Sequence, residues 1–433
     1  MDPTTVGFIG LIILIIILFS RMPVGFVMAL LGVVGFSYVV SWEAGMRMLA
    51  KDFFNVFGSY SLTVVPLFIL MGQITFHAGI SRRLFDTAYT FVGHMPGGLA
   101  MATIGACAGF AAICGSTNAA AATMATVALP EMKRYKYGMA LGSGTVAAGG
   151  SLGILIPPSV IFIVYGILTE QSIGKLFVAG VLPGILLSLL FALTIYIWVS
   201  LRPDIAPKGP KTTFRQKIIS LSGVGETLAL FVLVMGGLFV GFFTPTEAGA
   251  IGAGGAILLG FLRRRLTWKK CLQAVYESTR ISCMVMVIVA GATLFGHFLA
   301  ITRIPYAVAT WVSEMPLPNF AIMAFIILIY LVGGCFIDAL ALILLTIPIF
   351  YPVVTEMGYN PIWFGVIIVL VTQMGVITPP VGVNVYVVNG VAKDVPLQTI
   401  FKGAFPFLLA LIACAMILIP FPGIALFLPG LMR

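Results

Sequence analysis

Two short motifs, GILIPPS at 153–159 and GVITPPV at 375–381, each place a Pro-Pro pair four residues after a glycine within a long apolar segment. A helix cannot continue through such a motif, because proline lacks a backbone donor and clashes with the preceding turn. Inside a membrane the freed carbonyls are costly unless they line a cavity or meet a ligand. Two such breaks at matching places are typical of transport proteins built from repeats.

Two polar interruptions accompany the breaks, ICGSTNA at 113–119 and GGCFID at 333–338. Gly115 permits a sharp turn, and Ser116, Thr117 and Asn118 offer oxygens to a hard cation or hydrogen bonds to a polar solute. Asp338 is the one acidic residue deep in an apolar run, so it is a candidate cation ligand. The competing interpretation is structural, since Ser and Asp also cap helices.

A half-helix that starts after each break directs the positive end of its dipole toward the centre, which suits an anionic solute. The alternative is that each Pro-Pro motif only kinks a continuous membrane helix. That interpretation does not explain why each of the two breaks is accompanied by a polar interruption. We therefore expect a solute site at Ser116, Thr117, Asn118, Pro157, Pro158, Pro379, Pro380, Gly382 and Asn384. We expect sodium sites at Ser116, Asn118, Gly153 and Ile154 in the first half and at Gly333, Asp338, Gly375, Val376 and Thr378 in the second.

The composition indicates a polytopic membrane protein. The 433 residues are 60% hydrophobic and 9% charged, with a mean hydropathy of +1.13, whereas soluble domains carry about 25% charged residues. The net charge of +10 is spread between apolar segments, as topology signals are, and does not predict nucleic-acid binding. No phosphate-binding loop, nucleophile elbow, paired cysteine motif or histidine metal motif occurs, so we expect neither an enzyme nor a cofactor.

The apolar segments divide into two similar halves of an all-α fold. The first, 1–201, contains scaffold spans within 4–79, a surface arm helix at 80–94, a re-entrant hairpin at 97–130, a broken span at 138–168 and a last span at 173–201. A basic linker, 202–217, leads to the second, 218–433, with scaffold spans within 221–301, an arm at 303–314, a hairpin at 317–350, a broken span at 361–392 and a last span at 397–430. Ser61 and Gln73 border an early span and could reach the site or bond neighbouring helices.

Charge placement predicts that the halves are inverted relative to each other. If the hairpins open to opposite sides, 19 of the 24 Lys and Arg residues fall on the cytoplasmic side, and only Arg47, Lys51, Lys175, Arg303 and Arg433 fall outside. Matching residues keep offsets of 220 to 224, as in Pro23 with Pro245 and Gly72 with Gly296. Inverted repeats with broken helices are a transporter architecture.

The motifs ICGSTNA, GILIPPS and GVITPPV, together with Pro66-Leu67-Phe68 before Met71-Gly72 and TPTEAG at 244–249, resemble a known family. It is the large membrane subunit (DctM-like, or M subunit) of tripartite ATP-independent periplasmic (TRAP) transporters, within the ion-transporter superfamily. The resemblance covers essentially the whole chain. It implies sodium-driven import of carboxylate-bearing solutes, such as C4-dicarboxylates or sialic acid, into bacteria across the inner membrane. It also implies two partners: a small four-helix membrane subunit, here expected as a separate chain, and a periplasmic substrate-binding protein.

We therefore expect an elevator-type, sodium-coupled permease subunit in which the hairpins and broken spans move against the scaffold spans. One alternative is a stand-alone sodium/anion symporter that needs no binding protein. Another is a channel component, which would give passive flux. An intramembrane enzyme has less support, since no nucleophile is paired with a base.

Overall fold

The computed structural model describes residues 2–18, 22–314 and 316–432, and no strand occurs within these ranges. The predicted all-α membrane protein is confirmed. Arg21 and Arg433, which contribute to the predicted charge asymmetry, lie outside the described residues, as does Met315 at the expected start of the second hairpin.

The first half begins with four scaffold helices and an arm. They are α1 (Pro3–Leu18), α2 (Val24–Val39), α3 (Trp42–Phe57), α4 (Val64–His77) and α5 (Ile80–Val92). The hairpin follows as α6 (Gly98–Cys114) and α7 (Thr117–Arg134), the broken span as α8 (Met139–Ser151) and α9 (Val160–Leu168), and the last span as α10 (Ile173–Leu201). Short 3-10 turns at Ser61–Thr63, Leu152–Ile154 and Pro203–Ile205 complete this half.

The second half repeats the order from the arm onward. Its scaffold comprises α11 (Phe214–Leu221), α12 (Gly225–Phe231), a π-helical turn (Val232–Gly236), α13 (Gly237–Val240), α14 (Pro245–Leu262) and α15 (Trp268–Ile301). The arm is α16 (Ile304–Glu314), the hairpin α17 (Asn319–Gly334) and α18 (Ala339–Glu356), and the broken span α19 (Pro361–Val376) and α20 (Val383–Val391). The chain closes with α21 (Leu397–Leu418) and α22 (Gly423–Leu431).

Five helices among the described residues are long and apolar enough to cross a membrane, or up to seven if each of two bent helix pairs forms one span. One of these five is α18, the second helix of the second hairpin. The other half-helices of the hairpins and broken spans, at 9 to 18 residues, are not among the five. A spanning helix needs about 20 residues, so we expect them to reach only part of the way across. Such partial elements are tolerated in a membrane because surrounding protein covers their ends.

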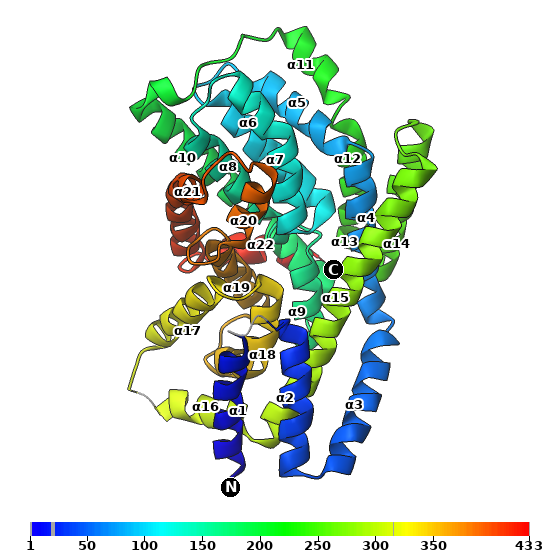
Figure 1. Ribbon diagram of the computed structural model, residues 1–433, viewed down its shortest axis with the longest axis vertical. Coiled ribbons are helices and arrows are strands. Elements are labelled where there is room, and N and C mark those ends of the chain that lie inside the picture. Colours follow the sequence, from blue (N-terminus) through cyan, green and yellow to red (C-terminus); the bar gives the residue numbers. More distant parts are fainter. Residues whose placement is uncertain (1, 19–21, 315, 433) are drawn as a thin grey trace.

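The arms lie at opposite ends of the molecule. In Figure 1, α5 lies at the top with α6 and α11, whereas α16 lies at the bottom near α1. The scaffold helices α2, α3, α4, α14 and α15 run along one side, and the broken spans and hairpins fill the centre. This placement is what inverted repeats require, while the symmetry relation itself stays a prediction.

Several boundaries differ from the sequence predictions. Helix α3 occupies residues that we did not predict as a helix, and it meets the segment Ser61–His77 at a bend of 55°. Helix α15 begins at Trp268 and so includes a polar first part that a search for apolar spans does not mark, because polar residues lower the hydropathy of a segment without preventing helix formation. Helix α11 begins inside the expected linker, and the expected last span at 397–430 is two helices.

Candidate functional site

Each hairpin reverses at a tip that is capped by the side chain of a predicted site residue. Gly115 has φ +64°, which lets the chain leave α6, and Ser116 Oγ then accepts a hydrogen bond from Ala119 N at 3.4 Å. In the second hairpin, Asp338 Oδ1 accepts from Leu340 N at 3.0 Å. The capping interpretation is therefore confirmed for both residues, and it leaves their remaining lone pairs available to a ligand.

The broken spans pack directly behind these tips. A Cβ atom added to Gly153 would lie 2.5 Å from the Ser116 carbonyl oxygen, and one added to Gly375 would lie 2.1 Å from the Gly334 carbonyl carbon. Val381 N also donates to Cys335 O at 3.3 Å. Only glycine permits such close backbone approach, so each break packs backbone to backbone against its own tip.

Both tips open onto a single cavity of about 370 Å³ between the hairpins and the scaffold. From the tips come the three polar residues of the first hairpin and Asp338 with Ala339 and Leu340 of the second. The opposite wall is formed by α4, through Ile69, Gly72 and Gln73, and by α15, through Ile281, Met284, Val285 and Ile288. The structure thus brings Ser116, Thr117, Asn118, Ile154 and Asp338 together.

The cavity combines weak positive and formal negative charge. The first residues of α7 and α18 line it, so the positive ends of two helix dipoles lie at the cavity, and Asp338 supplies a carboxylate. Among the described residues that line it there is no Lys, Arg or His. No group of three or more His, Cys, Asp and Glu side chains in the described ranges could hold a metal ion. A cation here would therefore rely on hydroxyl, amide and carbonyl oxygens plus one carboxylate.

Other predicted residues lie outside the cavity lining. They are Gly153, Pro157, Pro158, Gly333, Gly375, Val376, Thr378, Pro379, Pro380, Gly382 and Asn384. Asn384 is fully buried and donates to Ala147 O at 2.9 Å, so its amide joins α20 to α8. Thr378 Oγ1 donates to the Met374 carbonyl. Gly333 faces a different, apolar groove between α1 and α17.

Sequence reasoning missed acidic residues that the fold brings inward. Glu277 lies beside His77, with 3.0 Å between Oε2 and Nε2, and Asp52 Oδ2 lies 3.2 Å from His297 Nε2. Glu277 precedes the hydrophobic part of α15, and Asp52 lies in the amphipathic helix α3. Neither residue is therefore surrounded by apolar sequence that would mark it as buried. Gln73, one of the two polar residues that border an early span, lines the main cavity.

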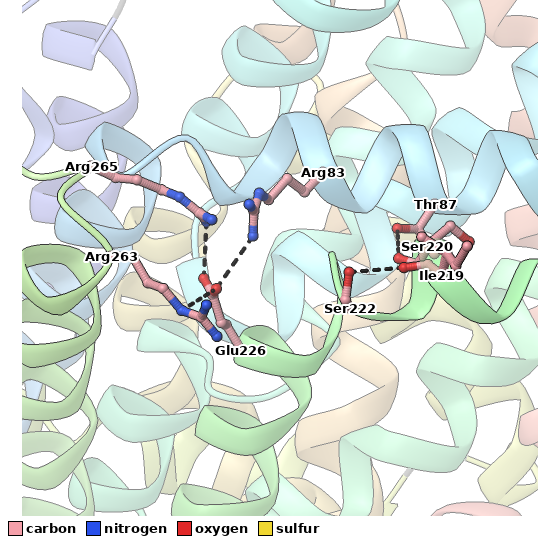
Figure 2. A network of polar contacts seen from close by, with 8 residues as sticks. All are labelled: Arg83, Thr87, Ile219, Ser220, Ser222, Glu226, Arg263 and Arg265. Carbon is pink, nitrogen blue, oxygen red and sulfur yellow. Dashed lines mark hydrogen bonds and ion pairs between the residues drawn. The ribbon is translucent and has the colours of Figure 1, made fainter. Parts of the chain in front are cut away.

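A third acidic residue anchors the scaffold at the end that carries α5. Glu226 is 8% exposed and lies between three arginines (Figure 2). Its Oε1 is 3.3 Å from Arg83 Nη1 and 3.2 Å from Arg263 Nε, and its Oε2 is 3.1 Å from Arg265 Nη1. Nearby, Thr87 Oγ1 donates to Ser220 O at 2.8 Å. These contacts tie the arm helix α5 to α12 and to the turn before α15.

Residues 11–424 match the family model for the DctM component of tripartite ATP-independent periplasmic transporters. The chain belongs to this family. Among curated DctM components, it is 38% identical over 386 residues to the C4-dicarboxylate TRAP transporter large permease protein of Pseudomonas aeruginosa, covering 89% of this chain and 90% of that protein. It is 33% identical to the sialic acid TRAP transporter large permease protein of Vibrio cholerae, covering 98% of this chain and 97% of that one.

The fold of this DctM component is also found in a solved transporter structure. The crystal structure of the Alcanivorax borkumensis YdaH transporter matches with a TM-score of 0.62 over 90% of each chain, at 14% sequence identity. At that identity the likeness concerns the fold alone. The resemblance read from the motifs is therefore confirmed, and the protein is a multi-pass transporter permease subunit, not an enzyme.

Proposed function

We propose that this DctM component is the permease of a sodium-coupled, binding-protein-dependent importer of a carboxylate-bearing organic solute in the bacterial inner membrane. The observation that carries the proposal is the single cavity onto which both capped hairpin tips open, with Ser116 on one side and Asp338 on the other. Two half-helix N-termini favour a carboxylate by their dipoles, and Asp338 favours a cation.

The cavity and the relatives both support this solute class. The relatives described above are named for C4-dicarboxylates and for sialic acid, both of which carry carboxylates. In this chain no cationic side chain is among the described residues lining the cavity. A carboxylate would instead meet backbone N–H groups at the start of α7 and α18, with hydrogen bonds from Thr117, Asn118 and Gln73.

Sodium would occupy one site at each tip. Ser116 and Asn118 with the carbonyls of 153–156 form the first, and Asp338 and Thr378 with the carbonyls of 375–377 form the second. The close packing of Gly153 on Ser116 and of Gly375 on Gly334 supports this pairing, because it holds carbonyl groups beside the tips. Oxygen donors of this kind suit a hard cation.

Transport would proceed by movement of the hairpins and broken spans as one body. Support comes from their mutual packing, since α8 contacts α6 and α7 while α19 contacts α17 and α18. The scaffold helices α4 and α15 line the cavity mainly with apolar side chains. Such a surface makes few directional contacts, so the hairpins and broken spans could slide along it. A small four-helix membrane subunit would enlarge the scaffold, and a periplasmic binding protein would deliver the solute.

Reconstitution into liposomes tests the proposal. The chain is combined with a small subunit and a binding protein from the same transporter type, and uptake of labelled succinate and sialic acid is followed with and without an inward sodium gradient. We expect accumulation only with sodium, both partners and one of the solutes. Equal uptake by the chain alone would favour the stand-alone symporter, and flux without accumulation would favour a channel component. Co-purification of the chain with the small subunit in a one-to-one ratio is the accompanying expectation.

A further inference from the structure

Three arginines converge on one carboxylate at the end of the molecule that carries α5 (Figure 2). Arg83 comes from the arm, and Arg263 and Arg265 come from the turn between α14 and α15. Each has a side-chain nitrogen 3.1 to 3.3 Å from an oxygen of Glu226. We call these three side chains the arginine cluster. Because one negative charge faces three positive charges, the cluster keeps a positive surplus.

The arginine cluster has hydrogen-bond donors to spare. A guanidinium group carries five N–H donors, and among the described residues the ion pairs of these three side chains all go to Glu226. The arginine side chains are 25 to 59% exposed, whereas the carboxylate is largely buried. Donors that do not reach Glu226 are therefore open to a ligand on the outer side of the cluster.

The charges around Arg265 are not balanced. Burial lowers the pKa of its guanidinium first; Glu226 acts in the opposite direction, and the neighbouring Arg83 and Arg263 lower the pKa again. The net direction is downward, so one carboxylate does not offset burial and two like charges together. A second anion would do so, and phosphate suits the cluster because it accepts bidentate hydrogen bonds from arginine.

Neighbouring side chains place the cluster at the level of lipid headgroups. Trp268, close in sequence to Arg265, is exposed, and its ring centroid lies 6.3 Å from that of the exposed Phe261. Tryptophan concentrates at the boundary between hydrocarbon and headgroups. The helices that begin or end at the cluster expose large apolar side chains toward the membrane interior, namely Leu228, Val232 and Leu233 after Glu226 and Leu258 and Leu262 before Arg263.

Helix α11 beside the arm has the composition of an interfacial helix. It is tied to α5 by Thr87 Oγ1, which donates to Ser220 O at 2.8 Å, and by Thr212 Oγ1, which donates to Thr90 O at 2.7 Å. It exposes Phe214, Ile218 and Ile219 and carries Arg215 and Lys217. Basic amphipathic helices lie in the membrane surface beside anionic lipids. Since basic residues mark the cytoplasmic side, we expect this surface to be the cytoplasmic one.

We propose that the arginine cluster binds the headgroup phosphate of an anionic phospholipid of the cytoplasmic leaflet, whose acyl chains lie on the apolar sides of α12 and α14. The lipid would join the arm to the scaffold, because Arg83 belongs to one and Arg263 and Arg265 to the other. The small subunit is the competing occupant of this face. A lipid is favoured because it brings an anion and apolar chains together at headgroup depth, where basic residues attract anionic lipids.

Native mass spectrometry of the full chain in a non-ionic detergent tests the site. The probes are dioleoylphosphatidylglycerol, which is anionic, and dioleoylphosphatidylcholine, which is zwitterionic. Arg263→Gln is the test variant, because Arg263 is the most exposed member of the cluster. Lys269→Gln is the control, because it removes an equal charge from the start of α15, outside the cluster.

We expect Arg263→Gln to weaken binding of the first phosphatidylglycerol roughly tenfold or more, since hydrogen bonds to a charged group are lost. Lys269→Gln should weaken it about fivefold or less, through loss of general attraction alone. Equal losses in the two variants would overturn the proposal, as would equal binding of the two lipids by the unmodified chain.

Glu226→Gln distinguishes a lipid site from a purely structural cluster. The change removes the anion that competes with the phosphate, so we expect phosphatidylglycerol to bind at least roughly threefold more tightly. The melting temperature in detergent should fall, because the arginines lose their shared partner, and phosphatidylglycerol but not phosphatidylcholine should restore most of that loss. Weaker binding of phosphatidylglycerol by folded Glu226→Gln, or no recovery of its melting temperature, would contradict the proposal.

Two further measurements identify the occupant. Glycerol 3-phosphate and inorganic phosphate carry the same anion without acyl chains, and recovery of the Glu226→Gln melting temperature by either would show a soluble-anion site and refute the lipid assignment. In the complex with the small subunit, retained phosphatidylglycerol supports the proposal, whereas its release would assign this face to the subunit. These measurements need neither solute nor sodium, so their outcome is separable from that of the uptake assay.

Discussion

Ser151 and Gln373 lie 222 residues apart in sequence, and the Oγ atom of one is 3.4 Å from the Oε1 atom of the other in the buried centre of the broken spans. The same offset relates Pro157 to Pro379 at the breaks and the capping residues Ser116 and Asp338 at the tips. Two equivalent residues can touch only near the axis that relates them. The contact therefore places a two-fold axis between α8 and α19, if the predicted inverted symmetry holds.

Gln373 gives the first prediction. It is fully buried, and its Nε2 has no hydrogen-bond partner among the described residues. Gln373→Met keeps the length of the side chain and removes the unpaired donor, so we expect thermal stability in detergent to be unchanged or raised by about 1 kcal/mol. Gln373→Ala should lower it by about 2–4 kcal/mol through the cavity that it leaves. Clear destabilisation by Gln373→Met would indicate that Nε2 bonds an ordered water or an ion.

The second prediction separates the two roles of Asp338. Asn caps helices about as well as Asp, so Asp338→Asn retains the bond to Leu340 N and removes the charge. We expect normal protein yield with a sodium concentration for half-maximal uptake raised at least roughly tenfold, measured in the reconstituted system. Asp338→Ala should in addition lower the melting temperature. Wild-type sodium dependence in Asp338→Asn would exclude the carboxylate as a sodium ligand.

The third prediction concerns the glycines behind the tips. In Gly153→Ala and Gly375→Ala the new methyl group would meet backbone atoms of Ser116 and Gly334 at 2.5 and 2.1 Å. Backbone atoms cannot move aside as the end of a flexible side chain can, so the added methyl group must displace each tip. We therefore expect uptake to fall at least roughly tenfold. Gly254→Ala on α14 is the control, because nothing lies within 4 Å of its added Cβ. That change should raise stability by about 0.5–1 kcal/mol. Full activity of both tip variants would mean that the tips do not depend on this packing.

Local chemistry explains which parts of the fold could be predicted. The breaks, tips and hairpins were predicted because proline and glycine act on their own backbone, whatever surrounds them. Helix α3 was missed because Glu43, Arg47, Lys51 and Asp52 lower its hydropathy, although one face packs on α2 and α15. The part of the cavity wall that α15 forms was missed for a different reason. Glu277 and Ile281 reach the first hairpin only through tertiary packing, which sequence periodicity does not report.

The last prediction concerns the anchoring of the arm by Glu226. Its carboxylate is 8% exposed, whereas the three arginines around it are 25–59% exposed. Glu226→Gln leaves three cations clustered without their shared anion. A fully buried pair would lose about 3–5 kcal/mol when broken, but water screens these arginines, so we expect a loss of about 1–3 kcal/mol in thermal unfolding. Glu43→Gln, which breaks the exposed pair with Arg47, should cost less than about 0.5 kcal/mol.

The effect of Glu226→Gln on transport should follow from its position on the scaffold. Because Glu226 holds α5 to α12 and to the turn before α15, its loss should loosen the arm along which the first hairpin moves. We expect a lower maximal uptake rate with an unchanged sodium dependence, since no residue of the cavity is altered. A shift in sodium dependence with normal stability would contradict this view and would instead connect the arginine cluster to the ion sites.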